Sequence, residues 1–190
     1  MRDISKETIE KAASGDMAAF EEIYKTFSST VYTIAFNITR DHHDAEETTQ
    51  DIFVKVFGKL KDFKFESAFG TWIYRVAVNT AINIYNGRLR RRQKTVNLDE
   101  AGDMIDASAE MPADALEREG AKTEVADMLK NLRPEHRSCI VLREIEGLDY
   151  REIAAVLRIP LNTVRSRLKR AREALMDHRK QISKGARYGL

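Results

Sequence analysis

The 190-residue sequence lacks most of the features that build disulfide frameworks, thiolate metal sites or membrane spans. Its single cysteine, Cys139, excludes an internal disulfide and a zinc site with two or more thiolate ligands. No uncharged stretch reaches the roughly 18 residues that a membrane-spanning helix requires. Charges scattered through the N-terminal residues leave no apolar core for a secretion signal. We therefore expect a cytoplasmic protein that makes no membrane contact of its own.

Residues that break helices or build strands are also scarce. There are three prolines and nine glycines, and aromatic side chains make up 8% of the chain against 33% for charged ones. No run of alternating Val, Ile or Thr is bounded by turn residues, and no repeat of fixed period is present. This composition predicts an all-α fold.

The net charge of +2 conceals an uneven distribution along the chain. Residues 1–92 carry 14 basic and 13 acidic side chains, residues 93–120 carry 2 and 8, and residues 121–190 carry 16 and 9. The middle segment has no sustained helical period before Pro112, and its Asp, Glu, Ala and Ser content buries little apolar surface. We therefore predict two small helical domains, 1–92 and 121–190, joined by an acidic flexible linker.

A long helix forms the centre of the first predicted domain. Gly15 ends a short preceding helix, and Asp16 is placed to cap the next one. The apolar residues of this next helix recur at helical spacing and are expected to form one buried stripe: Phe20, Ile23, Tyr24, Phe27, Val31, Ile34, Ala35 and Ile38.

A helix over residues 44–57 has a polar face that includes a valine. Its buried seam is expected to consist of Ala45, Thr49, Ile52, Val56 and Leu60. The opposite face carries Glu47, Gln50 and Asp51, with Val54 among them and Phe57 at their border. An exposed apolar side chain framed by carboxylates and an amide suits a protein partner. A solvated acidic face that tolerates one valine explains the same pattern, so both interpretations stay open.

The segment 63–92 combines aromatic, amide and cationic side chains. Its inward face is expected to consist of Ile73, Val76, Ala77, Thr80 and Ile84, and its outward face of Thr71, Trp72, Arg75, Asn79 and Asn86. A loop with Phe63, Phe65 and Phe69 precedes the helix, and Arg88, Arg90, Arg91 and Arg92 follow. Aromatic rings stack on bases, amides form hydrogen bonds with base edges, and cations bind phosphates. The segment is therefore a candidate binding site for single-stranded nucleic acid. The alternatives are a packing role for Trp72 and arginines that only stabilise a helix C-terminus.

The second predicted domain contains two short helices before a longer one. Pro134 opens the first at a tolerated position, and Gly147 is placed to end it. Asp149 and Glu152 have the spacing of a capping box, which predicts a short helix through Leu157 followed by a turn at residues 158–160.

The longer helix, from Leu161 onward, has a buried stripe and a basic outer face. Val164, Leu168, Ala171 and Leu175 recur at helical spacing, whereas Asn162, Ser166, Lys169, Arg170 and Glu173 point away, flanked by Arg165, Arg167 and Arg172. Together with the short helices, this pattern predicts a DNA-binding helix-turn-helix. The alternative is an amphipathic surface helix without a DNA contact. The nine basic and two acidic residues from Arg165 to the end of the sequence favour DNA binding.

Three segments resemble, in the same order and spacing, the extracytoplasmic-function (ECF) group of bacterial sigma factors. They are DAEETTQDIFVKVF at 44–57, SAFGTWIYRVAVNTA at 67–81 and LRPEHRSCIVLREIEGLDYREIAAVLRIPLNTVRSRLKRARE at 132–173. The resemblance implies a region 2 domain, a linker and a region 4 domain, with no catalytic site, cofactor or metal. It also implies three partners: core RNA polymerase, through its largest and second-largest subunits, promoter DNA, and an anti-sigma factor.

The same resemblance implies roles for individual residues. Glu47, Gln50, Asp51 and Val54 match the family's contact with the clamp helices of the largest polymerase subunit. The residues that match the reader of the opened -10 element are Phe63, Trp72, Tyr74, Arg75, Asn79 and Lys55. The residues that match the reader of the -35 duplex are Thr163, Arg165, Ser166, Lys169 and Arg170.

Two other classes of function remain to be compared with this one. A stand-alone helix-turn-helix repressor or activator could use the face around Val54 for dimerisation, and it would bind a palindromic site without polymerase. An enzyme is not indicated, because adjacent histidines in the His42-His43-Asp44 segment do not readily chelate one metal ion, and no phosphate loop or nucleophile–base pair is present.

Overall fold

The computed structural model describes residues 4–96, 129 and 132–188, and these residues form helices and no strand. The all-α prediction is confirmed. The helices of the first domain are α1 (Lys6–Ala13), α2 (Met17–Thr39), α3 (His42–Lys59), the 3-10 turn η1 (Leu60–Asp62) and α4 (Phe69–Val96). Those of the second are α6 (Pro134–Ile140), the π-helical turn η3 (Val141–Ile145), α7 (Tyr150–Leu157) and α8 (Leu161–Tyr188).

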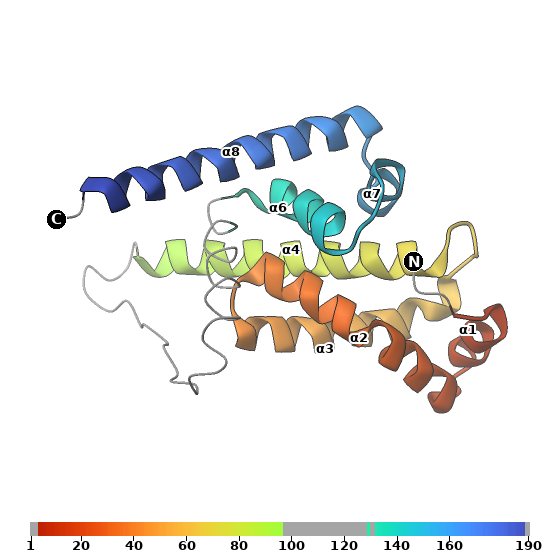
Figure 1. The fold of residues 1–190 in the computed structure, drawn as a ribbon. Coiled ribbons are helices and arrows are strands. Elements are labelled where there is room, and N and C mark those ends of the chain that lie inside the picture. Colours follow the sequence, from red (N-terminus) through yellow and green to blue (C-terminus); the bar gives the residue numbers. More distant parts are fainter. Residues whose placement is uncertain (1–3, 97–128, 130–131, 189–190) are drawn as a thin grey trace, which may run out of the picture.

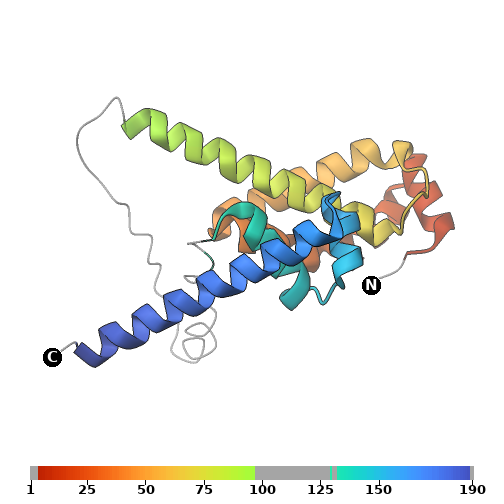
Figure 2. The ribbon, with the colours of Figure 1, turned by 90° about the horizontal axis from the view of Figure 1, so that it is seen from above.

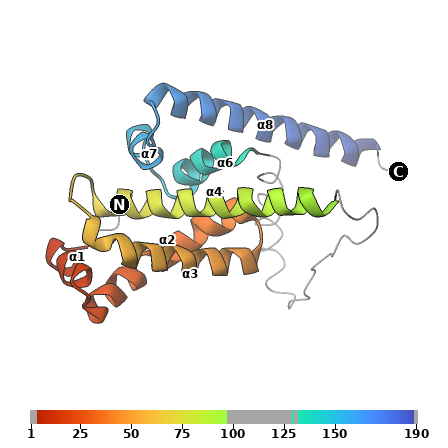
Figure 3. The same cartoon turned by 180° about the vertical axis from the view of Figure 1, so that it is seen from behind.

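The helices form two groups that meet along α4. Figure 1 shows α2 and α3 on one side of α4, with α1 at their end, and α6, α7 and α8 on the other side. The view from above shows α8 crossing over α6 at an angle, and the view from behind shows the same order of layers (Figures 2 and 3). The C-terminal helices therefore lie against the N-terminal helices.

The core of the first group is the predicted stripe of α2 packed on α3 and α4. Its fully buried members include Ile23, Phe27, Val31, Ile34, Ala35, Ile38, Ala45, Ile52, Val56, Ile73 and Ala77. Tyr24 was wrongly predicted to be buried, because its side chain is 46% exposed. Its ring lies 4.6 Å from that of Phe53 at the rim of the α2–α3 contact, where the hydroxyl can stay in water. Val76 and Ile84, predicted to face inward, are only half-buried.

Helix ends follow the predicted capping chemistry. The Asp16 carboxylate accepts from the backbone N–H groups of Ala18 and Ala19 at the start of α2. Asp149 and Glu152 form the predicted reciprocal capping box of α7, with N–H to carboxylate distances of 2.7 and 2.8 Å.

Two turns of the second group adopt positive φ. Gly147, at φ +71°, follows η3 as predicted, and a glycine takes this conformation without steric cost. Arg158, at φ 52°, is the left-handed cap of α7. A left-handed backbone conformation costs a residue other than glycine on the order of 1 kcal/mol. Contacts with the surrounding residues, and not the local backbone preference, therefore hold the turn between α7 and α8.

Cys139 lies in the core of the second group. Its side chain is fully buried with Leu142, Ile153, Val156, Val164 and Leu168. Burial raises the pKa of the Cys139 thiol to about 11. A buried, protonated thiol is unreactive, so the cysteine is a packing residue.

The linker prediction falls mostly outside the described residues. Helix α4 continues through Val96, past the predicted end of the first domain at residue 92, and the chain from 97 to 128 is not described. In the described part of the chain, no helix is both long and apolar enough to cross a membrane.

Two adjacent threonines of α3 differ in hydrogen bonding. The hydroxyl of Thr48 is buried without a hydrogen-bond partner among the described residues, whereas Thr49 donates to the carbonyl of Ala45 at 2.7 Å. We expect Thr48→Val to raise the free energy of unfolding by about 1 kcal/mol. Valine has nearly the same shape as threonine, and it replaces the buried hydroxyl that has no hydrogen-bond partner by a methyl group. Urea denaturation measures the change. Thr49→Val is the matched control and should give no increase; equal gains in both variants would contradict the prediction.

Candidate nucleic-acid interface

The outer face of α3 carries the predicted partner residues. Glu47, Gln50 and Asp51 are exposed, and Val54 is 72% exposed. Arg88 of α4 holds the Glu47 carboxylate at 2.7 Å and also forms an ion pair with Asp44. The face therefore presents carboxylates and one exposed valine to solvent, as both interpretations of the sequence predict.

An apolar patch that the sequence did not predict adjoins this face. Phe57 is 43% exposed and contacts Phe20 of α2, with 4.9 Å between ring centroids. Tyr24 and Met17, on the same side of α2, are also exposed. Eight large hydrophobic residues are exposed in the described part of the chain, and four of them are Met17, Tyr24, Phe57 and Val54. Spacing along one helix could not reveal this patch, because it arises where two helices pack side by side.

An aromatic cluster stands at the start of α4. The ring centroid of Phe63 lies 5.3 Å from those of both Phe69 and Trp72, and 4.8 Å from that of Phe65. Phe69 is buried, whereas Phe63 and Trp72 are half-buried and present part of their rings. Trp72 therefore packs, as one interpretation of the sequence predicts, and it also presents part of its ring to solvent.

A cavity of about 400 Å³ opens beside the aromatic cluster. Its lining includes the rings of Phe63 and Trp72 together with the cations Lys64, Arg75 and Arg158. Asp62 and Glu66 also line it. Two ring surfaces beside several cations suit a nucleic-acid base and its phosphate.

The outward face predicted for α4 is only partly exposed. Asn79 is exposed, but Thr71 was wrongly placed outward: it is buried, because the first turn of α4 is enclosed together with Phe69. Tyr74 is also buried, with only 4% of its side chain exposed. The first turns of α4 therefore have little free surface.

Arg75 and Tyr74 contact the second group of helices. Arg75 donates from Nη2 to the carbonyl of Ala155 at 2.8 Å and from Nε to that of Val156 at 3.3 Å. Burial lowers the pKa of Arg75, and the nearby charge of Arg158 lowers it further. Tyr74 donates to the Glu146 carboxylate at 3.5 Å.

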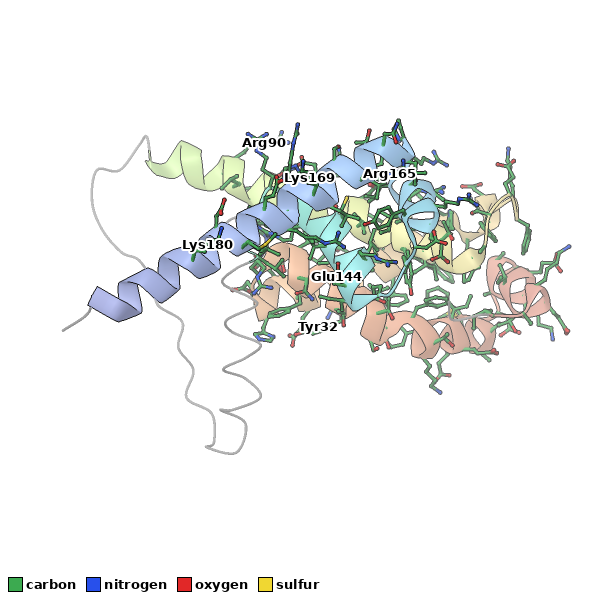
Figure 4. All side chains as sticks on the ribbon, turned by 45° about the horizontal axis from the view of Figure 1, so that its top comes forward. Tyr32, Arg90, Glu144, Arg165, Lys169 and Lys180 are labelled. Carbon is green, nitrogen blue, oxygen red and sulfur yellow. The ribbon has the colours of Figure 1, made fainter. Side chains whose placement is uncertain are left out.

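The outer face of α8 agrees with the predicted recognition helix. Arg165, Ser166, Lys169 and Arg170 are exposed, and Thr163 is half-buried. Figure 4 labels Arg165 and Lys169 on the first half of α8, and Lys180 further along. The stripe of Val164, Leu168 and Ala171 on the opposite side is fully buried. Because α7 precedes this helix across a short turn, the two form a helix-turn-helix.

Lys55 and the histidine segment also belong to α3. Lys55 is exposed on α3. His42 shares a 2.8 Å hydrogen bond between its Nδ1 and the Tyr32 hydroxyl, and it stacks on Phe36. Among the described residues no group of three or more His, Cys, Asp or Glu side chains could hold a metal ion.

Two family models match the chain on either side of the predicted linker. The model described as Sigma-70 region 2 matches residues 23–95, and the model described as Sigma-70, region 4 matches residues 122–175. The chain belongs to the sigma-70 family. This confirms the resemblance drawn from its motifs.

Curated relatives place this sigma factor in the ECF group, and a solved structure has a similar fold. It is 34% identical over 175 residues to the RNA polymerase sigma-H factor of Pseudomonas aeruginosa, covering 90% of this chain and 91% of that protein. It is 30% identical over 191 residues to the ECF RNA polymerase sigma factor SigW of Bacillus subtilis, covering 96% and 98%. CnrH, solved in complex with the cytosolic domain of CnrY, aligns with a TM-score of 0.66 at 25% identity, covering 92% of this chain and 96% of that one.

The aromatic cluster of the sigma factor gives a fluorescence prediction. Trp72 is the only tryptophan, and Phe63 covers part of it. We expect Phe63→Ala to shift the Trp72 emission to longer wavelength and to lower the free energy of unfolding by about 1–2 kcal/mol, because several ring contacts are lost. Phe36→Ala, which removes a ring that stacks on His42 instead, is the control. The same emission shift in both variants would contradict the assigned packing.

Proposed function

We propose that this sigma factor binds core RNA polymerase through α3, opens the -10 element with the first half of α4, and reads the -35 element with α8. The observation that carries the proposal is the presence of a partner face, an aromatic and cationic cavity and a basic recognition helix in one chain. A stand-alone repressor would not need the first two, and the relatives are sigma factors and not repressors or enzymes.

The polymerase contact is assigned to the region 2 domain, residues 1–92. Glu47, Gln50, Asp51 and Val54 would meet the clamp helices of the largest subunit, and the exposure of Val54 supports this because burial against a partner would remove its apolar surface from water. The acidic linker, residues 93–120, would run through the nucleic-acid channels between the two largest subunits, where carboxylates face basic walls.

Opening of the -10 element is assigned to the cavity and to the helix face that follows it. Phe63 and Trp72 would stack on a base turned out of the duplex, and Asn79 would bond a base edge. Arg75 and Lys55 would bind phosphates of the strand, and Tyr74 would support the extruded base. Unstacking a base costs a few kcal/mol, which these contacts must offset.

Reading of the -35 element is assigned to the region 4 domain, residues 121–190. Side chains of the exposed face of α8 are placed to enter the major groove, where Arg and Lys match guanine and each bidentate contact discriminates by roughly 1–3 kcal/mol. They are Thr163, Arg165, Ser166, Lys169 and Arg170.

The remaining assignments follow from the group. The sigma factor would act in the cytoplasm, without catalysis or cofactor, and would be restrained by an anti-sigma factor. CnrH was solved with the cytosolic domain of CnrY, and a comparable partner is proposed here.

Run-off transcription tests the proposal. Core RNA polymerase is incubated with a library of promoter fragments, with and without the protein. Specific transcripts that require the protein are expected. Binding of the protein alone to a palindromic duplex, without any transcript or any affinity for core polymerase, would instead establish a stand-alone regulator.

Val54 gives a prediction about polymerase binding. We expect Val54→Asp to weaken the affinity for core polymerase by about tenfold or more, because a charge would be buried in place of an apolar contact. Leu89→Asp on α4, another exposed apolar position, is the matched control and should bind normally. Fluorescence anisotropy with labelled core measures both. Unchanged binding of Val54→Asp would remove the role assigned to α3.

Substitutions of Arg170 and Asn79 distinguish the two proposed DNA contacts. We expect Arg170→Ala to weaken duplex binding at the -35 element by about 1–3 kcal/mol without loss of core binding. Asn79→Ala should slow promoter opening while leaving that duplex contact intact. Footprinting detects the first effect and permanganate reactivity of unpaired thymines the second. Equal loss of both activities in either variant would contradict the division of roles.

A further inference from the structure

One arginine of the recognition helix is held by two other segments of the helix-turn-helix group. Arg172 of α8 donates from Nη2 to the carboxylate of Glu144 in η3 at 2.7 Å. Over a longer distance of 3.4 Å, its Nη1 donates to the hydroxyl of Tyr150, the first residue of α7. Glu144 is labelled in Figure 4. A guanidinium is planar and rigid, so contacts through two of its nitrogens fix its orientation as well as its position.

Tyr150 is itself held in place by a second arginine. The guanidinium carbon of Arg143 lies over the Tyr150 ring, 5.4 Å from its centroid, and Nη1 of Arg143 donates to the carbonyl of Leu148 at 2.9 Å. Arg143 and Tyr150 are both half-buried. The network therefore runs from the residues before α7, through Arg143 and Tyr150, to Arg172 on α8.

The backbone around Glu144 is also unusual. In the π-helical turn η3, the N–H of Glu146 donates to the carbonyl of Val141, five residues earlier, at 3.0 Å. Such turns are rare overall, but they occur often at functional sites. The Glu144 and Arg172 side chains are 51% and 43% exposed, and an ion pair this exposed adds little to folding stability. Stability alone therefore does not account for a network that spans three segments.

The network opposes rotation of α8 about its own axis. The buried stripe of Val164, Leu168 and Ala171 holds the helix through non-directional apolar contacts. Arg172 follows Leu168 by four residues, so its directional contacts lie at the edge of this stripe. A rotation of about 15° would move an arginine tip, roughly 9 Å from the helix axis, by about 2 Å. Base contacts require side chains that are held to within about 0.5 Å.

We propose that Glu144 and Tyr150 are positioning residues for the -35 reader. Through Arg172 they set the rotation of α8, and with it the accuracy with which Lys169 and Arg170 meet base edges. The proposal rests on the duplex-reading function assigned above to α8. The network then contributes to the choice between DNA sequences and not to the general affinity for DNA.

Two substitutions break the network in ways that distinguish position from charge. Glu144→Gln removes a negative charge near the DNA-binding helix, so electrostatics alone predicts tighter binding to every duplex. Arg172→Lys keeps the positive charge, but an ammonium group lacks the planar pair of nitrogens that holds both partners. Asp177→Asn is the matched control, because the pair of Asp177 with Lys180, at 3.7 Å, lies within α8 and joins it to no other segment.

The measured quantity is discrimination within the -35 element by the holoenzyme, formed from core RNA polymerase and the full-length chain. Two promoter fragments from the run-off assay compete in one transcription reaction. They differ in length and in one base pair of the -35 element, and the ratio of their transcripts gives the discrimination at that base pair. The base pair used is one at which Arg170→Ala lowers the ratio.

We expect Glu144→Gln and Arg172→Lys each to lower this ratio by about three- to tenfold, which is part of the discrimination that a bidentate base contact gives. Asp177→Asn should leave the ratio unchanged. Partial unfolding or loss of a phosphate contact would reduce transcription from both promoters equally and would not change the ratio.

Thermal melting shows which variants fold, and if one does not, the other decides the test. A wild-type ratio in either folded variant would overturn the proposal, as would an equal decrease in Asp177→Asn.

Failure of the -35 assignment gives a different result. If Arg170→Ala leaves the ratio unchanged at every base pair of the element, the assignment of α8 is wrong and the positioning role falls with it. If Arg170→Ala lowers the ratio at a base pair where Glu144→Gln and Arg172→Lys do not, the assignment holds and the positioning role is wrong.

Discussion

Unpaired carbonyls at helix ends organise the contact between the two helix groups. The last turns of α2 and α7 each receive an arginine from the other group, Arg137 and Arg75 respectively. A hydrogen bond between a charged donor and a carbonyl is stronger than a neutral one, and a buried guanidinium that lost its acceptors would cost several kcal/mol. The positions of the cavity and of the recognition helix therefore depend in part on these two side chains, of which Arg137 is itself fully buried.

In each proposed surface, a buried helix face holds the exposed side chains of the same helix in position. The buried seam of α3 fixes the direction in which Val54 points, and the buried stripe of α8 does the same for Arg165 and Lys169. The aromatic cluster differs, because Phe63 and Trp72 contribute to packing and to the cavity at once. The single-strand surface is thus the one most sensitive to how the helix groups are arranged.

Local sequence patterns predicted much of this molecule. The capping box of Asp149, the turn at Gly147 and the buried stripe of α8 depend on residues within a few positions of one another, and the structure confirms all three. The exposure of Val54 followed from helical periodicity alone. Three motifs in sequence also identified the family that the comparisons then confirmed.

Contacts between distant segments could not be predicted in this way. The sequence marked Arg75 as outward-facing, but its acceptors lie about 80 residues further on. Arg137 carried no signal of burial, since a charged residue is expected at the surface. Tyr24 and Thr71 were misplaced for the same reason, because the exposure of a helix position depends on which neighbouring segments cover it. The apolar patch of Met17, Tyr24 and Phe57 likewise forms only when α2 and α3 lie side by side.

The distance between the two helix groups tests the account most directly. Spin labels at Lys59→Cys and Met176→Cys, exposed positions in different groups, would be introduced with Cys139→Ala to remove the native thiol. Double electron–electron resonance on the free chain should give one narrow distance distribution. Addition of core polymerase and promoter DNA should lengthen the distance, because α4 and α8 then bind separate promoter elements. A broad distribution in the free chain, or a distance that is unchanged in the open promoter complex, would contradict the account.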